Sequence, residues 1–445
     1  MLQQPDIIDV GARIDAGRWT ALQKSAVLLA ALSIILDGFD SQLIGYAIPS
    51  MMAEWELSRG AFSPVVAAGL FGMSIGSAFI GPAADCLGRK RAMIASMLLI
   101  GFATIAIAFV TNIMTLAGLR FAAGLGIGAA LPAATTLAAE FTPARHRVIA
   151  VTAAIVCVPL GGMLAGLVSA WALADFGWRS LFLIGGALPI LFSIVVITGL
   201  HESPRFLARK LDRSEEMRRL AIRLGWEGAA TARFIEQAGA GASRADIRDV
   251  MRRRADTIGL WLSFFLCLLA VYSAFSWLPS MLTAEGLSPA QSGWGLTVYN
   301  MGGVIGSLLC AQAIVRWGSR LSLGTACLAA AASAFALAWI GVADPLLLAI
   351  CLGLHGLFVN GVQSTLYAVA AHVYPTEIRA TGTAFALSFG RLGAILSAFA
   401  GAAVIGANGA TAFMAMLGIV MLGVGAALLA IRNHILPQSQ EKAAT

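Results

Sequence analysis

The sequence predicts an all-α polytopic membrane protein with twelve transmembrane helices in two six-helix bundles. Of its 445 residues, 59% are hydrophobic and 12% are charged, and the mean hydropathy is +0.83, whereas soluble domains carry about 25% charged residues. Apolar runs of about 20 residues, the length of a membrane-crossing helix, recur about twelve times. They follow one another too closely, and alternate too little, for a β-barrel.

The chain divides into two bundles around a polar stretch. The first bundle is expected over residues 25–200, with spans near 25–48, 61–84, 92–110, 114–138, 148–171 and 180–200. The second is expected over 257–431, with spans near 257–279, 291–313, 321–342, 345–370, 381–404 and 410–431. Residues 1–24 and 432–445 form end segments. In the basic central loop, 201–256, residues 213–224 and 244–254 resemble amphipathic surface helices, but a solvated linker whose charge fixes topology is our favoured interpretation.

Basic residues predict the orientation. Most of them fall on the side of the N-terminus, while the opposite loops keep only Arg59 and Arg179. The positive-inside rule then places both termini in the cytoplasm, and we expect a multi-pass protein of a bacterial inner membrane. The net charge of +7 therefore reflects topology and not a nucleic-acid surface. The first 24 residues lack the apolar core of a cleavable signal peptide.

Four charged side chains lie well inside predicted spans: Asp37, Asp40, Arg120 and Arg391. Such a charge is costly in hydrocarbon unless it is paired, hydrated or protonated. Asp37 and Asp40 share a helix face, and the helical rise of about 1.5 Å per residue places Asp40 level with Arg120. We expect Asp37, Asp40 and Arg120 to couple movement of a proton, without choosing between the aspartates. A permanent Asp40–Arg120 ion pair that holds helices together is the alternative.

Arg391, in the opposite bundle, indicates an anionic substrate, because a guanidinium grips a carboxylate through two parallel hydrogen bonds. Aromatic and polar side chains at similar depths are candidates to contact a ring and its hydroxyl groups. Ordinary packing and interhelical hydrogen bonds remain open alternatives for them. The ring candidates are Phe39, Trp277, Tyr299, Phe385 and Phe389, and the hydroxyl candidates are Asn300, His355, Asn360 and Gln363.

The two bundles resemble each other in sequence. Residues 139–147 align with 371–379, so that Pro143 matches Pro375 and Arg147 matches Arg379. Repeats of this kind place a substrate site near the membrane midplane between the bundles, with access alternating as one half rocks on the other.

The loop Gly81-Pro-Ala-Ala-Asp85-Cys-Leu-Gly88-Arg89-Lys90-Arg91 resembles the signature loop of the major facilitator superfamily. Leu36-Asp37-Gly38-Phe39-Asp40, Arg120, and Tyr374-Pro375-Thr376-Glu377-Ile378-Arg379 leading to Arg391 are similar to the aromatic acid:proton symporter family. The resemblance implies the major facilitator fold and proton-coupled import of a hydroxybenzoate-like carboxylate by alternating access. It implies no cofactor besides protons, no nucleic acid and no obligate protein partner. Cys86 departs from the motif, which usually has a basic residue there.

The loop residues are expected to form a conformational latch with charges at the end of the fourth span. Glycines permit a tight reversal, and Asp85 can accept hydrogen bonds from a helix N-terminus or an arginine. The alternative is that the charges only set topology. The latch candidates are Gly81, Asp85, Gly88, Arg89, Lys90, Glu140 and Arg147.

Other functions remain as alternatives. A porter for another organic acid or a sugar-like solute would share the fold, and a membrane sensor of aromatic acids that does not transport belongs to a different class. The sequence has no nucleotide-binding motif and no nucleophile-plus-base arrangement, which argues against an ATP-driven pump and against an enzyme. Its six cysteines and five histidines lack the spacing of a metal or redox site.

Overall fold

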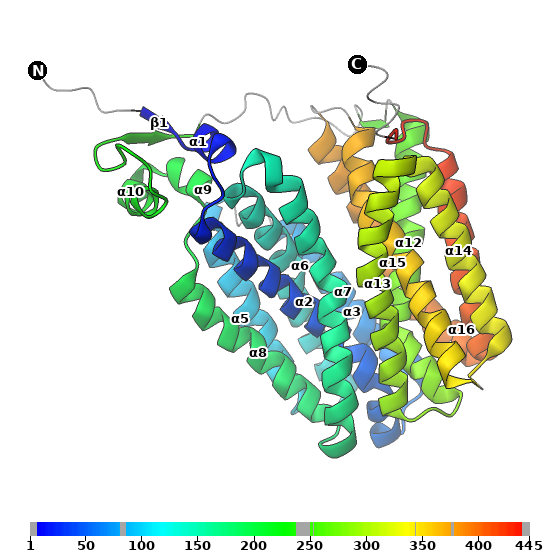
Figure 1. The fold of residues 1–445 in the computed structure, drawn as a ribbon. Helices are drawn as coiled ribbons and strands as arrows, with labels where there is room; N and C mark the ends of the chain where they lie inside the picture. The colour runs from blue at the N-terminus through cyan, green and yellow to red at the C-terminus, as the bar shows by residue number, and fades with distance from the viewer. Residues whose placement is uncertain are drawn as a thin grey trace, which may run out of the picture.

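The computed structural model describes residues 7–80, 86–236, 250–251, 253–342, 344–374 and 378–437, and its helices form two groups (Figure 1). Eleven helices of this described part are long and apolar enough to cross a membrane. The first half contains α2 (Ala21–Trp55), α3 (Ser63–Ile75), α5 (Arg89–Ile107), α6 (Ile113–Phe141), α7 (Ala144–Asp175) and α8 (Trp178–Gly199). The 3-10 turn η1 (Arg59–Phe62) precedes α3, and the π-helical turn η2 (Gly76–Ile80) extends it. The second half contains α12 (Arg254–Ala284), α13 (Pro289–Trp317), α14 (Ser319–Ile340), α15 (Pro345–Val373) and α16 (Arg379–Leu429).

The 51-residue α16 supplies the last two passes, because Gly409 interrupts it with φ 73° and ψ −167°. A positive φ of this kind is accessible to glycine at little cost. The part before Gly409 runs along α12 in the same direction, and the part after it runs in the opposite direction. The close approaches that show this are Gly393 to Phe265 and Gly401 to Trp277 before the break, and Gly423 to Leu266 and Gly259 to Ala427 after it. The predicted twelve passes are therefore confirmed, with a sharp reversal inside the predicted 404–410 connection.

Contacts between the halves lie toward the end of the molecule opposite the chain termini. Arg59 donates to Oγ of Ser280 at 2.7 Å and to its carbonyl oxygen at 3.0 Å. Nearer the middle, Gln42 and Asn300 exchange two side-chain hydrogen bonds of 3.2 and 2.8 Å. These contacts close the space between the halves on that side.

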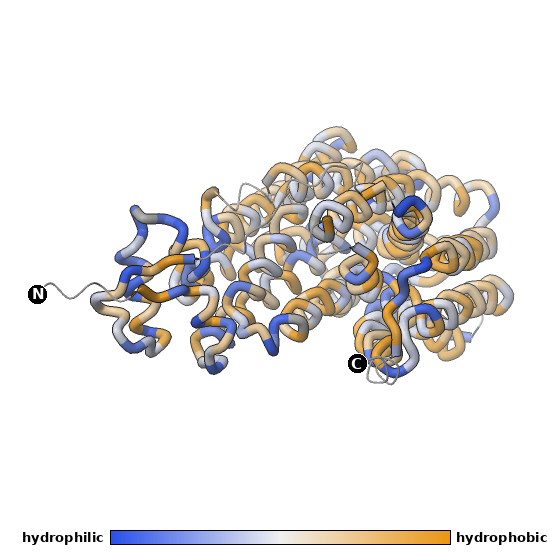
Figure 2. Tube along the Cα trace, turned by 90° about the horizontal axis from the view of Figure 1, so that it is seen from above, coloured by the Kyte–Doolittle hydropathy of each residue, from blue (hydrophilic) through white to orange (hydrophobic). Residues whose placement is uncertain are grey.

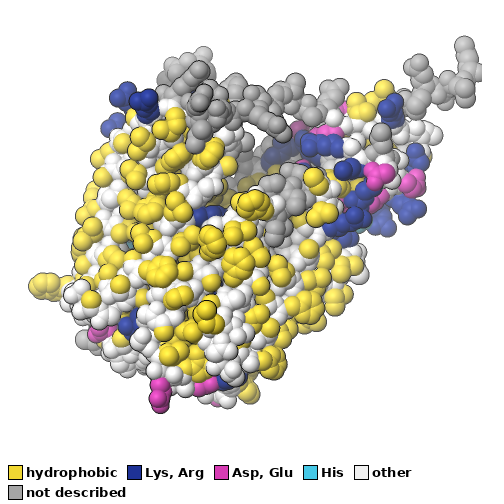
Figure 3. Space-filling model, turned by 180° about the vertical axis from the view of Figure 1, so that it is seen from behind, with side chains coloured by type: hydrophobic (Ala, Val, Ile, Leu, Met, Phe, Trp, Pro, Cys, Tyr) yellow, Lys and Arg dark blue, Asp and Glu magenta, His cyan; other side chains and the backbone are white. Residues whose placement is uncertain are grey.

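The outer surface is mostly apolar, as a membrane-spanning protein requires. Hydrophobic side chains cover the middle of the face in Figure 3, and most of its Lys and Arg side chains gather toward one end. Large apolar side chains such as Leu191 and Leu328 are exposed on this surface. Since lipid tails are themselves apolar, exposure of this kind is expected of a helix that faces the bilayer.

A small subdomain packs beside the N-terminus (Figure 2). Strand β1 (Ile7–Asp9) pairs in parallel with β2 (Arg233–Ile235), and α1 (Val10–Ala16), α9 (Pro204–Ala208), the 3-10 turn η3 (Leu211–Arg213) and α10 (Ser214–Arg223) surround them. Val10 and Ile14 share one apolar core with Phe206, Met217 and Leu220.

Residues 201–236 are thus folded, and the expectation of a solvated linker is wrong for this part. Helix α10 confirms the predicted helix at 213–224. The apolar face of α10 is buried against the N-terminal segment, which is distant in sequence, so the pairing was not visible in the sequence pattern. Most of the second predicted helix, 244–249 and 252, lies outside the described residues.

Candidate functional site in a cavity between the two halves

Asp40 forms a buried ion pair inside the first half. Nη1 of Arg120, from α6, lies 3.3 Å from Oδ2 of Asp40, whose side chain is fully enclosed. Thr104 of α5 donates its hydroxyl to Oδ1 at 2.5 Å. A buried carboxylate must be paired and hydrogen-bonded to be tolerated, and two neighbouring helices meet both needs. The Asp40–Arg120 ion pair that the sequence suggested is therefore present. Together with Thr104, it connects α2 to α5 and α6.

Gly38, between the two aspartates, brings α2 close to α7. A Cβ atom at Gly38 would lie 2.2 Å from the carbonyl oxygen of Val158, and one at Gly161 would lie 2.1 Å from that of Ile35. Only glycine permits this approach of two backbones. The short Asp-Gly-Phe-Asp stretch therefore combines a helix crossing with two buried carboxyl groups.

A cavity of about 330 Å³ lies between the halves. Asp37 of α2 and Arg391 of α16 both line it, so each half contributes one charged side chain. The other polar lining residues are Ser41, Ser74 and Thr135 from the first half and Tyr272, Gln363, Ser364 and Tyr367 from the second. Most of the remaining wall is apolar, as at Leu70, Ile127 and Leu268. An apolar cavity with a few convergent polar groups is the usual form of a small-molecule site.

Arg391 and Tyr272 bridge the cavity to Met73 of α3. Nη1 of Arg391 donates to the carbonyl oxygen of Met73 at 2.6 Å, and the Tyr272 hydroxyl lies 3.5 Å from its sulfur. This is the one hydrogen bond of Arg391 to the described residues, whereas a guanidinium has five donors. On the opposite wall, Oδ1 of Asp37 is buried without a hydrogen-bond partner in the described part of the chain. Both charged groups therefore retain capacity to bind a ligand.

The two aspartates face different surroundings. Asp37 lines the cavity, while Asp40 is enclosed with Arg120 and Thr104 and does not line it. Residues three apart on a helix point about 60° from one another, which is enough to separate the two carboxyl groups here. Of the two aspartates expected to couple proton movement, only Asp37 lines the cavity.

The structure does not bring most of the ring and hydroxyl candidates to the cavity. Of that set, Gln363 alone is among the lining residues described. Phe385 and Phe389 stack on Trp261, at centroid distances of 6.3 and 5.5 Å. Phe39 is buried toward Gly185 of α8.

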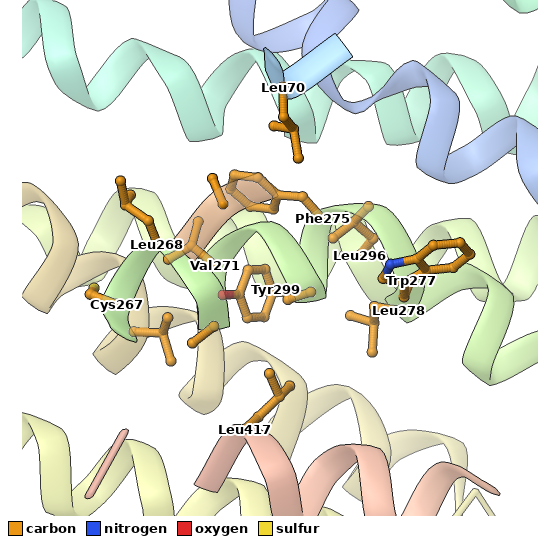
Figure 4. Close-up of a cluster of buried hydrophobic side chains, with 14 of the residues drawn as sticks. Leu70, Cys267, Leu268, Val271, Phe275, Trp277, Leu278, Leu296, Tyr299 and Leu417 are labelled. Carbon is orange, nitrogen blue, oxygen red and sulfur yellow. The ribbon is translucent and has the colours of Figure 1, made fainter. Parts of the chain in front are cut away.

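The remaining candidates pack within the second half. Tyr299 lies in a hydrophobic cluster with Cys267, Val271 and Leu417 (Figure 4). Its ring is 5.9 Å from that of His355, whose Nδ1 contacts Ser333. The other three candidates form hydrogen bonds: Asn360 donates to the carbonyl of Gly356, Asn300 to the side chain of Gln42, and Trp277 to the carbonyl of Ser397. For these residues, packing and hydrogen bonds within and between helices are the contacts observed.

Sequence reasoning missed six polar lining residues, and helix periodicity would have found two of them; the six are Ser41, Ser74, Thr135, Tyr272, Ser364 and Tyr367. Ser41 lies four residues after Asp37, and Tyr367 lies four residues after Gln363, so each shares a helix face with a residue already singled out. Ser364 is adjacent to Gln363. Tyr272 had no such neighbour among the candidates, and its position follows only from the packing of α12.

The latch candidates divide into two groups. Arg89 pairs with Glu140 through Nε–Oε2 and Nη2–Oε1 distances of 3.1 and 3.2 Å. Glu202 accepts from the backbone N–H of Lys90 at 3.1 Å, beside Gly88, where φ is +105° and a Cβ atom would lie 2.2 Å from Glu202. The loop is thus bound to α6 and to the segment after α8. Gly81 and Asp85 lie outside the described residues.

Arg147 does not pair with Glu140. It forms an ion pair with Asp15 of α1, and Asp15 also accepts from Arg205 at 2.7 Å. Arg205 in turn lies 3.2 Å from Glu236, and burial raises the pKa of this carboxyl although Arg205 and Arg209 oppose the effect. Arg147 therefore anchors the small subdomain to the start of α7.

Among the described residues, no group of three His, Cys, Asp or Glu side chains could hold a metal ion. The site geometry rests on a carboxyl group, a guanidinium and two tyrosines in a cavity between two helical halves. Together these features are those of a polytopic membrane transport protein.

The chain belongs to the Major Facilitator Superfamily, which it matches over residues 30–343 and 260–444. It is 36% identical over 405 residues to the 4-hydroxybenzoate transporter PcaK of Pseudomonas aeruginosa, covering 90% of each chain. It is 34% identical over 426 residues to the gallate transporter of Pseudomonas putida, covering 95% of each.

The fold resembles the partially occluded inward open conformation of the xylose transporter XylE from E. coli. The TM-score is 0.75 at 17% identity, over 93% of this chain and 99% of that one. The family, the fold and the assignment as a transporter, not an enzyme, are thereby confirmed.

Proposed function

We propose that this protein imports an aromatic carboxylate, such as a hydroxybenzoate, together with protons by alternating access to the central cavity. The observation that carries the proposal is that Arg391 of one half and Asp37 of the other line the same cavity. The names of the relatives, transporters of 4-hydroxybenzoate and gallate, support an aromatic acid as the substrate.

In the proposed complex, Arg391 grips the substrate carboxylate through two N–H groups. The substrate competes with the carbonyl oxygen of Met73, which occupies one of these donors at 2.6 Å in the structure. Tyr272 and Tyr367 offer ring faces and hydroxyls, and Gln363 offers an amide to a ring hydroxyl. The cavity volume, about 330 Å³, is at the small end for ligand pockets and suits a single ring.

Asp37 is the proposed proton carrier. Its unpartnered Oδ1 and its place on the cavity wall allow it to bind and release a proton as access alternates. Binding of an anion at Arg391 and of a proton at Asp37 lets the loaded site cross without a net buried charge from these groups. Asp40 and Arg120 contribute by holding α2 against α5 and α6.

The proposed setting is a bacterial inner membrane with both termini in the cytoplasm. The excess of basic residues on the side of the termini supports this orientation. Contacts between the halves lie on the opposite side, as at Arg59 and Ser280, so the conformation described is the inward-facing one under this orientation.

The test is uptake of labelled 4-hydroxybenzoate by proteoliposomes with and without an inward proton gradient. Benzoates, aliphatic acids and sugars serve as competitors. We expect accumulation that requires the gradient and that only aromatic acids inhibit. Asp37→Asn should abolish accumulation while substrate exchange without a gradient persists, and Asp175→Asn, at an exposed position at the end of α7, should behave as wild type. Inhibition by sugars alone, or gradient-independent uptake, would contradict the proposal, and binding without any uptake would favour a sensor.

A further inference from the structure

A groove of about 440 Å³ lies on the membrane-facing side of the second half, apart from the central cavity. It runs between α13 and α14 close to the turn at Gly318 that joins them, and Leu357 and Phe358 of α15 form its floor. The neighbouring side chains Leu321 and Leu328 of α14 are 58% and 62% exposed. The groove therefore opens toward the bilayer.

Four polar side chains line this otherwise mostly apolar groove: Gln312 and Arg316 of α13, and Ser322 and Thr325 of α14. The Thr325 hydroxyl is satisfied by carbonyl oxygens of its own helix. The Ser322 residue is only 5% exposed, and its hydroxyl has no hydrogen-bond partner in the described part of the chain. The side chain of Gln312 likewise forms no hydrogen bond with the described residues. Polar groups at a lipid-facing position are costly without partners, so their presence indicates a ligand with hydrogen-bond acceptors.

These side chains lie at successive depths from the turn at Gly318. Gln312 is four residues from Arg316, hence on the same face and about 6 Å further from the turn. Ser322 lies about 6 Å from the turn along α14, between Arg316 at about 3 Å and Gln312 at about 9 Å. The groove thus presents one cation near the surface and, within about one further helical turn, a hydroxyl and an amide.

Arg316 is an exposed cation at the end of α13. In the described residues it forms no ion pair with a carboxylate, and its guanidinium stacks on Trp317 at 5.5 Å from the ring centroid. Arg320 adds a second exposed cation on the other side of the turn. Tryptophan and arginine at a helix end mark the headgroup region of a bilayer, where basic side chains attract anionic lipids.

We propose that the groove binds one anionic phospholipid of the leaflet on the side of the chain termini. Its phosphate lies on Arg316, and Gln312 and Ser322 donate hydrogen bonds to its ester carbonyl oxygens. One acyl chain covers Leu309 and Ala326 along the groove. This proposal depends only on the membrane-spanning fold, and it holds whatever substrate the central cavity carries.

The test is native mass spectrometry of the full chain released from nanodiscs that contain equal amounts of phosphatidylglycerol and phosphatidylcholine. We expect wild-type protein to retain phosphatidylglycerol in preference to phosphatidylcholine. Since one basic residue near the surface contributes about 1 kcal/mol toward an anionic lipid, Arg316→Ala should lower that preference about fivefold. Gln312→Leu, which suits a lipid-facing helix, should also shorten retention without impairing folding.

Arg254→Ala is the matched control, because Arg254 is an exposed arginine at the same end of the second half and does not line the groove. Ala313→Phe fills the groove and keeps its charge, so it should reduce retention through loss of acyl-chain space. Equal retention of the two lipids by wild type would overturn the proposal. An equal loss in Arg316→Ala and Arg254→Ala would also overturn it, since the lipid would then respond to surface charge alone.

Discussion

Two carboxyl groups three residues apart in α2 lie in opposite surroundings. Asp40 is fully enclosed, with Arg120 on Oδ2 at 3.3 Å and Thr104 on Oδ1 at 2.5 Å. Asp37 lines a cavity, and its Oδ1 has no hydrogen-bond partner in the described residues. The guanidinium that lines the same cavity, Arg391, donates to the carbonyl oxygen of Met73 and not to Asp37. One pair is closed within a half, and the other is open between the halves.

The difference separates a contact that maintains the structure from groups that can act on a ligand. Each carboxylate oxygen of Asp40 has a partner, so this group has little capacity for another ligand, although Nε of Arg120 has no hydrogen-bond partner in the described residues. Removal of either charged side chain leaves a buried charge. The open groups form no ion pair with each other in the described residues, and they lie on different halves. Stability should therefore depend on Asp40 and Arg120, and transport on Asp37 and Arg391.

The largest expected effect is on stability at the closed pair. Arg120→Ala leaves Asp40 enclosed without its cation, so we expect the free energy of unfolding to fall by about 3–5 kcal/mol. Denaturant unfolding of the purified protein in detergent measures this change. Arg391→Ala is the matched variant at the open site, and its loss should be smaller, about 1.5–3 kcal/mol, because it removes one hydrogen bond of a charged group and leaves no enclosed charge without a contact partner. Equal losses in the two variants would break the distinction between closed and open pairs.

A smaller loss is expected at Thr104. Thr104→Val keeps the shape of the side chain but removes the hydroxyl that donates to Asp40. A hydrogen bond to a charged group contributes about 1.5–3 kcal/mol, so unfolding should become easier by that amount. Ser41→Ala serves as the control, because this cavity-lining hydroxyl donates only to the carbonyl of Gly38 in its own helix. A Thr104→Val protein as stable as Ser41→Ala would show that Asp40 does not need its second partner.

The contrast between the two aspartates also shows what the sequence could predict. Apolar run length and basic-residue counts were sufficient for the twelve passes, including the reversal near Gly409. Helix depth was sufficient to pair Asp40 with Arg120 and to place Asp37, Gln363 and Arg391 at the level of the cavity. These predictions depend on distance along a helix axis, which the residue number determines directly.

The sequence alone did not predict the direction in which each side chain points around its helix axis. Phe385 and Phe389 lie in the same helix as Arg391 yet stack on Trp261. Their direction depends on how α16 packs against α12, a contact between segments far apart in sequence. The same holds for the small subdomain, where Val10 and Ile14 find their apolar partners near Phe206. The i,i+4 relation would have recovered Ser41 and Tyr367, because it requires only one correctly placed neighbour.

At the open site, Arg391→Lys should weaken substrate recognition. Lysine keeps the positive charge but replaces a planar fork by a single ammonium group, so bidentate contact with a carboxylate is lost. We expect KM for the aromatic acid to rise about tenfold, equivalent to about 1.4 kcal/mol, with stability unchanged. Initial uptake rates over a range of substrate concentrations at a fixed gradient measure it. Arg179→Lys, in the exposed pair with Glu54, is the control; an unchanged KM in Arg391→Lys would move the carboxylate contact elsewhere.

The smallest expected effect is on the local stability of the subdomain, at a solvent-exposed contact between a guanidinium and an imidazole. Arg223 of α10 lies 2.6 Å from Nε2 of His201 in the subdomain region. Burial, followed by the positive charges of Arg223 and Lys90, lowers the pKa of His201 below its ordinary value of about 6.5. The contribution of His201 to stability is therefore present above about pH 6.5 and is lost as the pH falls through the lowered pKa.

Hydrogen exchange in residues 214–223 should therefore rise, after correction for intrinsic rates, when the pH is lowered from about 7.5 to about 5.5. His201→Gln keeps an acceptor for Arg223 but cannot titrate, so the pH dependence should disappear. His146→Gln, whose ring stacks on Trp19, should retain it. The effect should remain confined to the subdomain, because neither Asp40 nor Asp37 contacts it. Loss of the Asp40–Arg120 pair over the same pH range would instead show that the closed pair opens with the subdomain, and the two regions would then form one cooperative unit.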